Sequence, residues 1–145
     1  MSWPTPVPGL VIRYSYLWQR EADEGREEGV KDRPCAIVFV VHKDDDEAPL
    51  VAVLPVTHSV PQNTDAIEIP VLVKSRLKLD SEKSWIILSE ANIFRWPGPD
   101  LAPLVNGEPS TAAYGMLPPG LFDAVRKKFR SNLQRRLVEL VQRTE

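Results

Sequence analysis

The sequence has few of the residues that form disulfides or bind metals. Its 145 residues include one cysteine, Cys35, and two histidines, His42 and His58. A single cysteine excludes an internal disulfide, and Cys35 lies within an apolar run, where a buried and unreactive thiol is expected. One cysteine and two histidines do not give the ligand spacing of a zinc site. We therefore expect neither a metal nor another cofactor.

The sequence also lacks a dominant charge and long apolar segments. Its formal net charge is −2, which excludes the global positive field of a general nucleic-acid coat protein, so a polyanion would have to bind at a local patch. No stretch approaches the length of a membrane span, and the first ten residues, MSWPTPVPGL, do not resemble a signal peptide. Glycine-rich phosphate loops, nucleophile elbows and paired catalytic carboxylates are missing. These absences predict a cytoplasmic protein with no membrane partner.

The sequence does contain a series of short apolar segments. Its length predicts one domain over residues 1–145, and its 43% of hydrophobic residues predict a globular one. β-Branched and aromatic residues predict strands at 9–18, 34–41, 49–57, 66–70 and 84–88.

The second and third of these strands are the most distinctive. Residues 34–41 are continuously hydrophobic and should be buried on both faces. The strand at 49–57 should pair with it through a solvated turn at 43–48, with Pro55 at an edge, a bulge or the end of a ladder. The charged segment 19–32 predicts a long exposed loop, and 73–80 a helical turn or a connector.

The C-terminal segment is typical of a helix. Prolines suit a first turn, and apolar residues then recur at three- and four-residue steps: Leu121, Phe122, Val125, Phe129, Leu133, Leu137 and Leu140. This predicts an amphipathic helix over 117–143, with Phe122, Val125 and Phe129 facing the core. Strands followed by one helix predict a mostly β protein, a small and strongly curved β-barrel with a C-terminal helix.

Polar residues stand at the ends of two apolar strands. Pro34 favours an extended backbone at Arg33, so the guanidinium, a planar donor that suits phosphate, is presented at the strand entrance. The alternative is a surface arginine paired with Asp32 or with an acid of the preceding loop. Thr57 ends the next strand, where its hydroxyl could donate to an anionic oxygen, and Ser59 would share its face. Threonine is also simply a good strand residue.

Other candidates have structural explanations of equal or greater weight. His58 would point away from Thr57, as a surface or supporting group rather than a proton shuttle. Glu90 follows an apolar strand, where a solvated or salt-bridged carboxylate is common. Aromatic faces can stack nucleobases, but in a domain of this size the tryptophans are expected in the core: Trp18, Trp85 and Trp96. The basic cluster at 126–136 is expected to be a solvated helix face.

The order of these parts resembles the PemK/MazF family of toxins from toxin–antitoxin modules. The sharpest segments are DRPCAIVFVV (32–41) and VLPVTHS (53–59), followed by SWIIL-S-E (84–90) and the terminal LPP helix. The resemblance covers most of the chain, roughly from Pro8 to Phe129. It implies an SH3-like barrel, a homodimer and a cognate antitoxin. It also implies a sequence-specific, metal-independent endoribonuclease that cleaves single-stranded RNA to 2′,3′-cyclic phosphate and 5′-OH ends, with Arg33 and Thr57 as the active-site pair.

The chain departs from the family pattern near this pair. Ile87 and Ser89 stand where some members carry an arginine and an aspartate, and Glu90 lies one place after the usual acid. The segment 19–32 carries acidic residues in place of a threonine-glycine signature: Glu21, Asp23, Glu24, Glu27 and Glu28. The supporting residues are then Asp32, His58, Ser59 and Glu90, with no metal ligand. The alternative function is a non-catalytic barrel that binds a protein, as a topoisomerase poison or an inert homologue.

Overall fold

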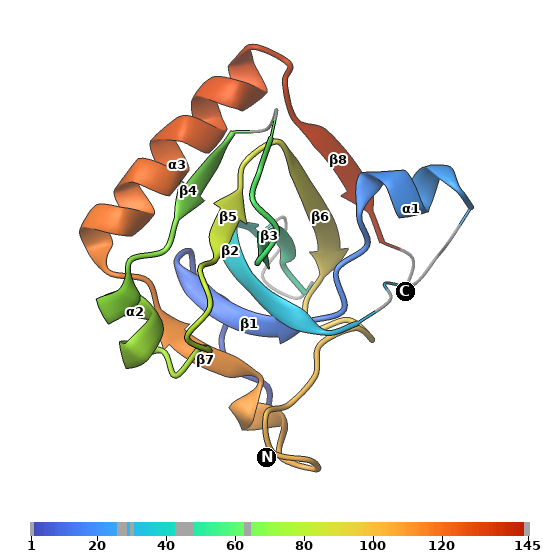
Figure 1. Cartoon of the computed structure of the whole chain (residues 1–145). Coiled ribbons are helices and arrows are strands. Elements are labelled where there is room, and N and C mark those ends of the chain that lie inside the picture. Colours follow the sequence, from blue (N-terminus) through green and yellow to red (C-terminus); the bar gives the residue numbers. More distant parts are fainter. Residues whose placement is uncertain (1, 26–28, 30, 43–47, 63–64, 144–145) are drawn as a thin grey trace.

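Strands dominate the computed structural model of this chain, which describes all residues except 1, 26–28, 30, 43–47, 63–64 and 144–145 (Figure 1). The strands are β1 Leu10–Tyr14, β2 Arg33–Val41, β3 Leu50–Thr57, β4 Ala66–Glu68, β5 Trp85–Ile87, β6 Glu90–Arg95, β7 Ala113–Met116 and β8 Glu139–Gln142. The helices are α1 Gln19–Asp23, α2 Val71–Arg76 and α3 Pro119–Gln134, with a 3-10 turn at Pro109–Thr111. The predicted mostly β fold with a C-terminal helix is confirmed. No helix among the described residues is long and apolar enough to cross a membrane.

The strands form one branched sheet centred on β3. Its main order is β4-β5-β3-β2-β1-β7, and β6 pairs with both β3 and β8. The pairs are antiparallel, except that β6 and β8 run parallel. On one side of β3, residues 50–53 pair with β6 and residues 56–57 with β5. Pro55 lies between these two ladders, where its missing N–H interrupts neither of them, so the predicted ladder end is confirmed.

The first hairpin follows the sequence prediction. β2 and β3 pair antiparallel from Cys35↔Pro55 to Val41↔Leu50. Alternate residues of β2 enter two clusters: Ala36 and Val38 pack toward Val125 and Phe129 of α3, and Cys35 and Ile37 pack on the opposite face. Burial on both faces explains why this strand is continuously apolar. The predicted turn at 43–48 lies outside the described residues, except for Ala48.

The predicted helix over 117–143 is wrong in its C-terminal third. α3 ends at Gln134, Arg136 adopts a left-handed φ of 59°, and residues 139–142 form β8 beside β6. Leu137 and Leu140, predicted on the apolar stripe, are each 48% exposed, whereas Val141 is buried. The run LVELV fits a period of two as well as a helical period, and the edge of β6 decides between them.

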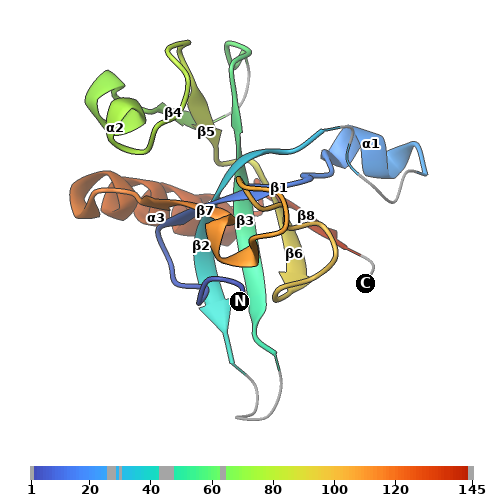
Figure 2. The same ribbon diagram turned by 90° about the horizontal axis from the view of Figure 1, so that it is seen from below.

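Two other expectations need correction. The segment 19–32 is not simply an exposed loop, because it begins with α1 and buries Glu21; Glu27 and Glu28 lie outside the described residues. β7, which pairs with β1, was not predicted from sequence. Figure 2 shows α2, β4 and β5 gathered beyond the Thr57 end of β3. This end of β3 is where the polar residues collect.

A buried arginine fastens the C-terminal strand. Arg143 donates to the Tyr14 hydroxyl at 3.2 Å, the Ser15 carbonyl at 2.6 Å and Asn92 Oδ1 at 3.1 Å, and its Nη2 lies 3.0 Å from Asp100 Oδ2. Asn92 is fully buried and also bonds the backbone of Leu17 through both amide atoms. A buried charge requires such partners. The end of the described chain is thereby tied to the segment that follows β1.

Candidate functional site

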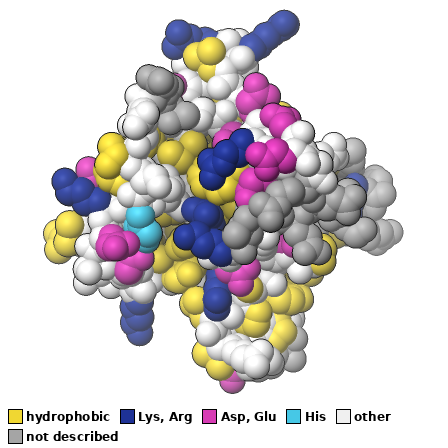
Figure 3. All heavy atoms as spheres, turned by 45° about the vertical axis from the view of Figure 1, so that its right-hand side comes forward, with side chains coloured by type: hydrophobic (Ala, Val, Ile, Leu, Met, Phe, Trp, Pro, Cys, Tyr) yellow, Lys and Arg dark blue, Asp and Glu magenta, His cyan; other side chains and the backbone are white. Residues whose placement is uncertain are grey.

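A cavity of about 760 Å³ opens where the start of β2, the end of β3 and the start of β6 meet. Its lining includes every residue that the sequence nominated: Asp32, Arg33, Thr57, His58, Ser59 and Glu90. Figure 3 shows Lys and Arg side chains in the middle of one face, with acidic side chains to either side and hydrophobic ones between them. The cavity therefore combines cationic and acidic walls around an apolar floor that includes Val56 and Ile87.

Arg33 enters the cavity from the first position of β2. Its Nη1 donates to the Val56 carbonyl at 3.4 Å, and its Cζ lies 5.0 Å from the centroid of the Trp18 ring. Its Nε is buried without a hydrogen-bond partner, and among the described residues Arg33 makes no ion pair. Burial lowers the pKa of Arg33, although the guanidinium remains charged at any working pH. A half-buried cation that makes no ion pair among the described residues favours an anionic ligand, although the charge of Glu21 also acts on Arg33.

Of the alternative partners of Arg33, Asp32 pairs elsewhere, while Glu21 of the preceding segment lines the same cavity and its charge raises the pKa of Arg33 against the larger effect of burial. The Asp32 carboxylate pairs with Arg13, whose Nη2 lies 3.7 Å from Asp32 Oδ2. Arg13 is held on its other side by the Pro103 carbonyl at 3.1 Å. The interpretation of Arg33 as a surface arginine neutralised by Asp32 is therefore wrong.

Trp18 packs against the edge of the core and also supports Arg33. The ring is half-buried, meets Tyr16 edge-on at 5.2 Å between centroids, and also lies 5.3 Å from the Arg20 Cζ. Its backbone N–H donates to Glu21 Oε1 at 3.1 Å, which fixes the start of α1. Of the other tryptophans, Trp96 is buried as expected and Trp85 is half-buried. Guanidinium groups over an indole ring are attracted to its π face, so Trp18 helps to place the charge of Arg33.

Thr57 ends β3 directly after the carbonyl that Arg33 contacts. Its Oγ1 accepts a hydrogen bond from the Ser59 N–H at 3.1 Å, a turn that threonine commonly makes. Because Oγ1 is the acceptor in this bond, the hydroxyl hydrogen can still donate to a ligand. The structure thus brings Arg33 and Thr57 to the same corner of the cavity, while Ser59 is exposed at its rim.

Glu90 lines the cavity from the first position of β6. One carboxylate oxygen, Oε1, accepts from the Tyr16 hydroxyl at 3.0 Å and from the Gln19 N–H at 2.9 Å. The other oxygen, Oε2, has no hydrogen-bond partner among the described residues. Burial raises the pKa of Glu90, and the bonds from Gln19 and Tyr16 counter this only in part. A carboxyl group with a raised pKa in a cavity is a candidate for proton transfer.

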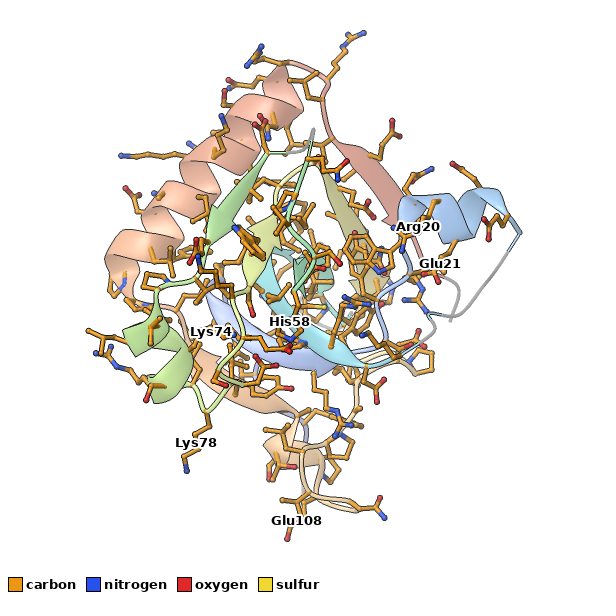
Figure 4. The ribbon with its side chains drawn as sticks, in the orientation of Figure 1. Arg20, Glu21, His58, Lys74, Lys78 and Glu108 are labelled. Atoms are coloured by element: carbon orange, nitrogen blue, oxygen red, sulfur yellow. The ribbon has the colours of Figure 1, made fainter. Side chains whose placement is uncertain are left out.

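His58 belongs to a network that sequence reasoning missed. Its Nε2 lies 2.7 Å from Asp80 Oδ2, and its Nδ1 lies 3.1 Å from both Ser84 Oγ and the Lys83 carbonyl. Lys74 of α2 donates to Ser84 Oγ at 2.7 Å and to Asp80 Oδ1 at 2.9 Å. Figure 4 shows the side chains of His58 and Lys74 close together, and those of Arg20 and Glu21 on α1 farther to the right, where they line the same cavity. α2 itself has three polar residues, so no local signal in the sequence marks Lys74 as the buried one.

The charged groups of this network lie beside groups of opposite charge. Desolvation raises the pKa of Asp80, but the hydrogen bond from Lys74 and the charge of His58 outweigh it, so the pKa is lowered. His58, Asp80 and Glu82 also offer ligand atoms within 4.8 Å of one another, as a metal site would require. All of them are exposed, and the direct His58–Asp80 contact together with Lys74 accounts for their arrangement without an ion.

Cys35 has no part in the cavity. The thiol is fully buried, contacts the Arg33 carbonyl at 3.6 Å, and has a pKa raised by desolvation. This confirms the buried thiol that the sequence predicts, in a state that favours the unreactive protonated form.

Comparisons of the chain with models of known protein families, with characterised proteins and with solved structures found no match. The geometry of the cavity therefore carries the functional argument.

Proposed function

We propose that this protein is the toxin of a toxin–antitoxin module, similar to the PemK/MazF family, and that its cavity cleaves single-stranded RNA without a metal ion. The observation that carries the proposal is Arg33, a half-buried cation with an unpartnered Nε, in one cavity with Thr57 and Glu90. Sites of this kind suit a phosphodiester, whose charge increases as a neighbouring hydroxyl attacks it.

Each of the three residues has a separate role in the proposed reaction. The ribose 2′-OH attacks the adjacent phosphorus, its proton passes to Glu90, and the new 2′-O–P bond replaces the P–O5′ bond. Arg33 stabilises the negative charge of the phosphorane, and the Thr57 hydroxyl donates to a non-bridging oxygen. The 5′-oxygen leaves as an alcohol after taking a proton from solvent. The products carry a 2′,3′-cyclic phosphate and a 5′-OH.

The proposal extends to the fold and its assembly. We infer an SH3-like barrel that acts as a homodimer and is neutralised by a cognate antitoxin. Support comes from the mostly β architecture, the β2–β3 hairpin that carries Arg33 and Thr57, and the helix that follows the strands. A dimer of a small protein is commonly isologous, with the same surface on both copies.

A second candidate function has one observation in its favour. The cavity is lined by Glu21, Asp32, Asp80 and Glu90 as well as by its cations. A groove that binds RNA through its phosphates is ordinarily positive along its length. This mixture of charges favours the alternative, a non-catalytic barrel that binds a protein partner.

One experiment separates these functions. The purified protein is incubated with a long RNA in EDTA, and the ends of the products are analysed beside those from Arg33→Ala. We expect cleavage by the wild type with cyclic phosphate and 5′-OH ends, and growth arrest when it is induced in cells. Products with a 5′-phosphate, a requirement for magnesium, or no cleavage at all would exclude the proposed chemistry.

A further inference from the structure

Three side chains that line the cavity, His58, Asp80 and Ser84, form a closed ring of hydrogen bonds with the buried Lys74 behind them. Lys74 Nζ donates to Ser84 Oγ at 2.7 Å, Ser84 Oγ lies 3.1 Å from His58 Nδ1, His58 Nε2 lies 2.7 Å from Asp80 Oδ2, and Asp80 Oδ1 accepts from Lys74 at 2.9 Å. We propose that this ring positions Thr57 against Arg33, so that Lys74 and Ser84 are positioning residues of the site. The inference rests on the proposed ribonuclease function.

Lys74 closes the ring from beneath the surface. The residue is only 4% exposed, and its ammonium contacts the Glu82 carbonyl in addition to Asp80 and Ser84. An ammonium has three donors, and these three acceptors use all of them. The Asp80 side chain is 53% exposed, so only the lysine end of this ion pair is buried. A buried ammonium needs its acceptors in place, and Lys74 therefore constrains where Ser84, Asp80 and the Glu82 carbonyl lie.

The ring is closed in the two protonation forms of His58 that carry a proton on Nε2. With only Nε2 protonated, Asp80 accepts from Nε2 and the Ser84 hydroxyl donates to Nδ1. With both nitrogens protonated, Nδ1 donates to Ser84 Oγ or to the Lys83 carbonyl at 3.1 Å, and the Ser84 hydroxyl can turn to the Glu82 carbonyl at 3.3 Å. Every donor has an acceptor in both cases, whereas a proton on Nδ1 alone would set the unprotonated Nε2 against the Asp80 carboxylate, so the ring requires a proton on Nε2.

The ring fastens the ladder that ends at Thr57. His58 follows Thr57 directly, and Ser84 directly precedes Trp85, the partner of Thr57 across the β3–β5 ladder. That ladder has only two pairs, at Val56 and Thr57, and so short a ladder is weak by itself. Val56 also supplies the carbonyl that Arg33 contacts. Loosening the ring would therefore move Thr57 relative to Arg33, and a displacement of about 1 Å can cost about a hundredfold in rate.

Two variants open the ring without touching Arg33 or Thr57. Ser84→Ala removes the link between Lys74 and His58, and Lys74→Met removes the ammonium while keeping the length of the side chain. The matched control is Lys127→Met on α3, which breaks an exposed ion pair with Asp123. Single-turnover cleavage should slow roughly tenfold or more in both ring variants, with KM within about twofold of wild type because the phosphate-binding groups remain. The control should match the wild type.

A second readout does not require activity. Hydrogen exchange of the β3–β5 ladder amides should accelerate about tenfold in Ser84→Ala and Lys74→Met but not in Lys127→Met. If the wild type does not cleave RNA, the proposed function is wrong, but the exchange measurement still tests whether the ring stabilises the β3–β5 ladder. Unchanged exchange in both ring variants would overturn the positioning role.

Coupling within the ring completes the test. Because either change opens the same cycle, the double variant Ser84→Ala/His58→Gln should be no slower in cleavage and no faster in exchange than Ser84→Ala alone. Ser84→Thr, which keeps the hydroxyl, should recover most of the wild-type behaviour. Additive effects of Ser84 and His58, or a loss in Ser84→Thr as large as in Ser84→Ala, would mean that these residues act separately.

Discussion

Replacing Arg33 by alanine should leave the fold almost as stable as before. The change removes a long hydrogen bond to Val56, about 0.5–1.5 kcal/mol, and the contact with the Trp18 ring, about 0.5–1 kcal/mol. It also removes a charge that burial disfavours, as the lowered pKa of Arg33 indicates. These effects oppose one another, so we expect the free energy of unfolding in urea to change by no more than about 1 kcal/mol.

The same replacement should nearly abolish cleavage. A preorganised charge directed at a developing oxyanion contributes on the order of 3 kcal/mol, or about a hundredfold or more in rate. Arg33→Lys should recover little of this, because an ammonium keeps the charge but loses the planar donor pair. The assay is single-turnover cleavage of a defined RNA, run beside the urea measurement on the same preparations.

Arg126→Ala is the matched control for this prediction. Arg126 lies on α3, pairs with Asp123 at 2.9 Å, and does not line the cavity. It should lose little stability, because exposed ion pairs contribute little, and keep its cleavage rate. Our reasoning would be refuted by an Arg33→Ala protein that cleaves normally, or by one that fails mainly because it unfolds.

Other predictions address the remaining groups of the cavity. Thr57→Val, which is nearly isosteric, should slow cleavage by roughly tenfold, the value of one hydrogen bond, with an unchanged urea midpoint. Trp18→Leu should slow cleavage roughly fivefold through the lost contact with Arg33, and a thermal melt should show whether the fold is intact. Burial raises the pKa of Glu90, so folding favours its protonated form and the carboxylate lowers the stability of the fold at neutral pH. Near pH 7, Glu90→Gln should therefore unfold at a higher urea concentration than the wild type. This difference should vanish as the pH falls below the ordinary glutamate pKa range. Light scattering at micromolar concentration should give a dimer, and a monomer would argue against a shared RNA groove.

The central strands and their polar ends could be predicted from the sequence because local signals agree there. Residues 34–41 are apolar at every position, and Pro55 marks the change of ladder partner. Arg33, Thr57 and Glu90 meet because strands of one small sheet begin and end at the same edge. Each of these three residues stands at a strand end, and strand ends can be predicted from the apolar run and the turn residues beside them.

The rest depends on contacts between distant segments. Lys74 is a polar residue in a short helix, and nothing local in the sequence places Ser84 and Asp80 around it or His58 beside them. Trp18 was expected in the core because aromatic residues are commonly buried; it packs against the core but also lines the cavity, where Arg20 and Arg33 lie over its ring. The tail from 137 to 142 carries an ambiguous period, so only the free edge of β6 could decide its structure.

The buried arginine near the end of the chain has a consequence for synthesis. Arg143 hydrogen-bonds Tyr14 and Ser15, which lie 129 and 128 positions earlier, so this part of the interior can form only after residue 143 has left the ribosome. A nascent chain that stops short of residue 143 lacks these bonds, although Asn92 still bonds the backbone of Leu17. Contacts of such long range also slow folding. Tyr14 pairs with Arg33 across β1 and β2, so an incomplete chain would hold Arg33 less firmly in the cavity. The cavity would therefore be fully formed only after the ribosome had translated the message beyond residue 143.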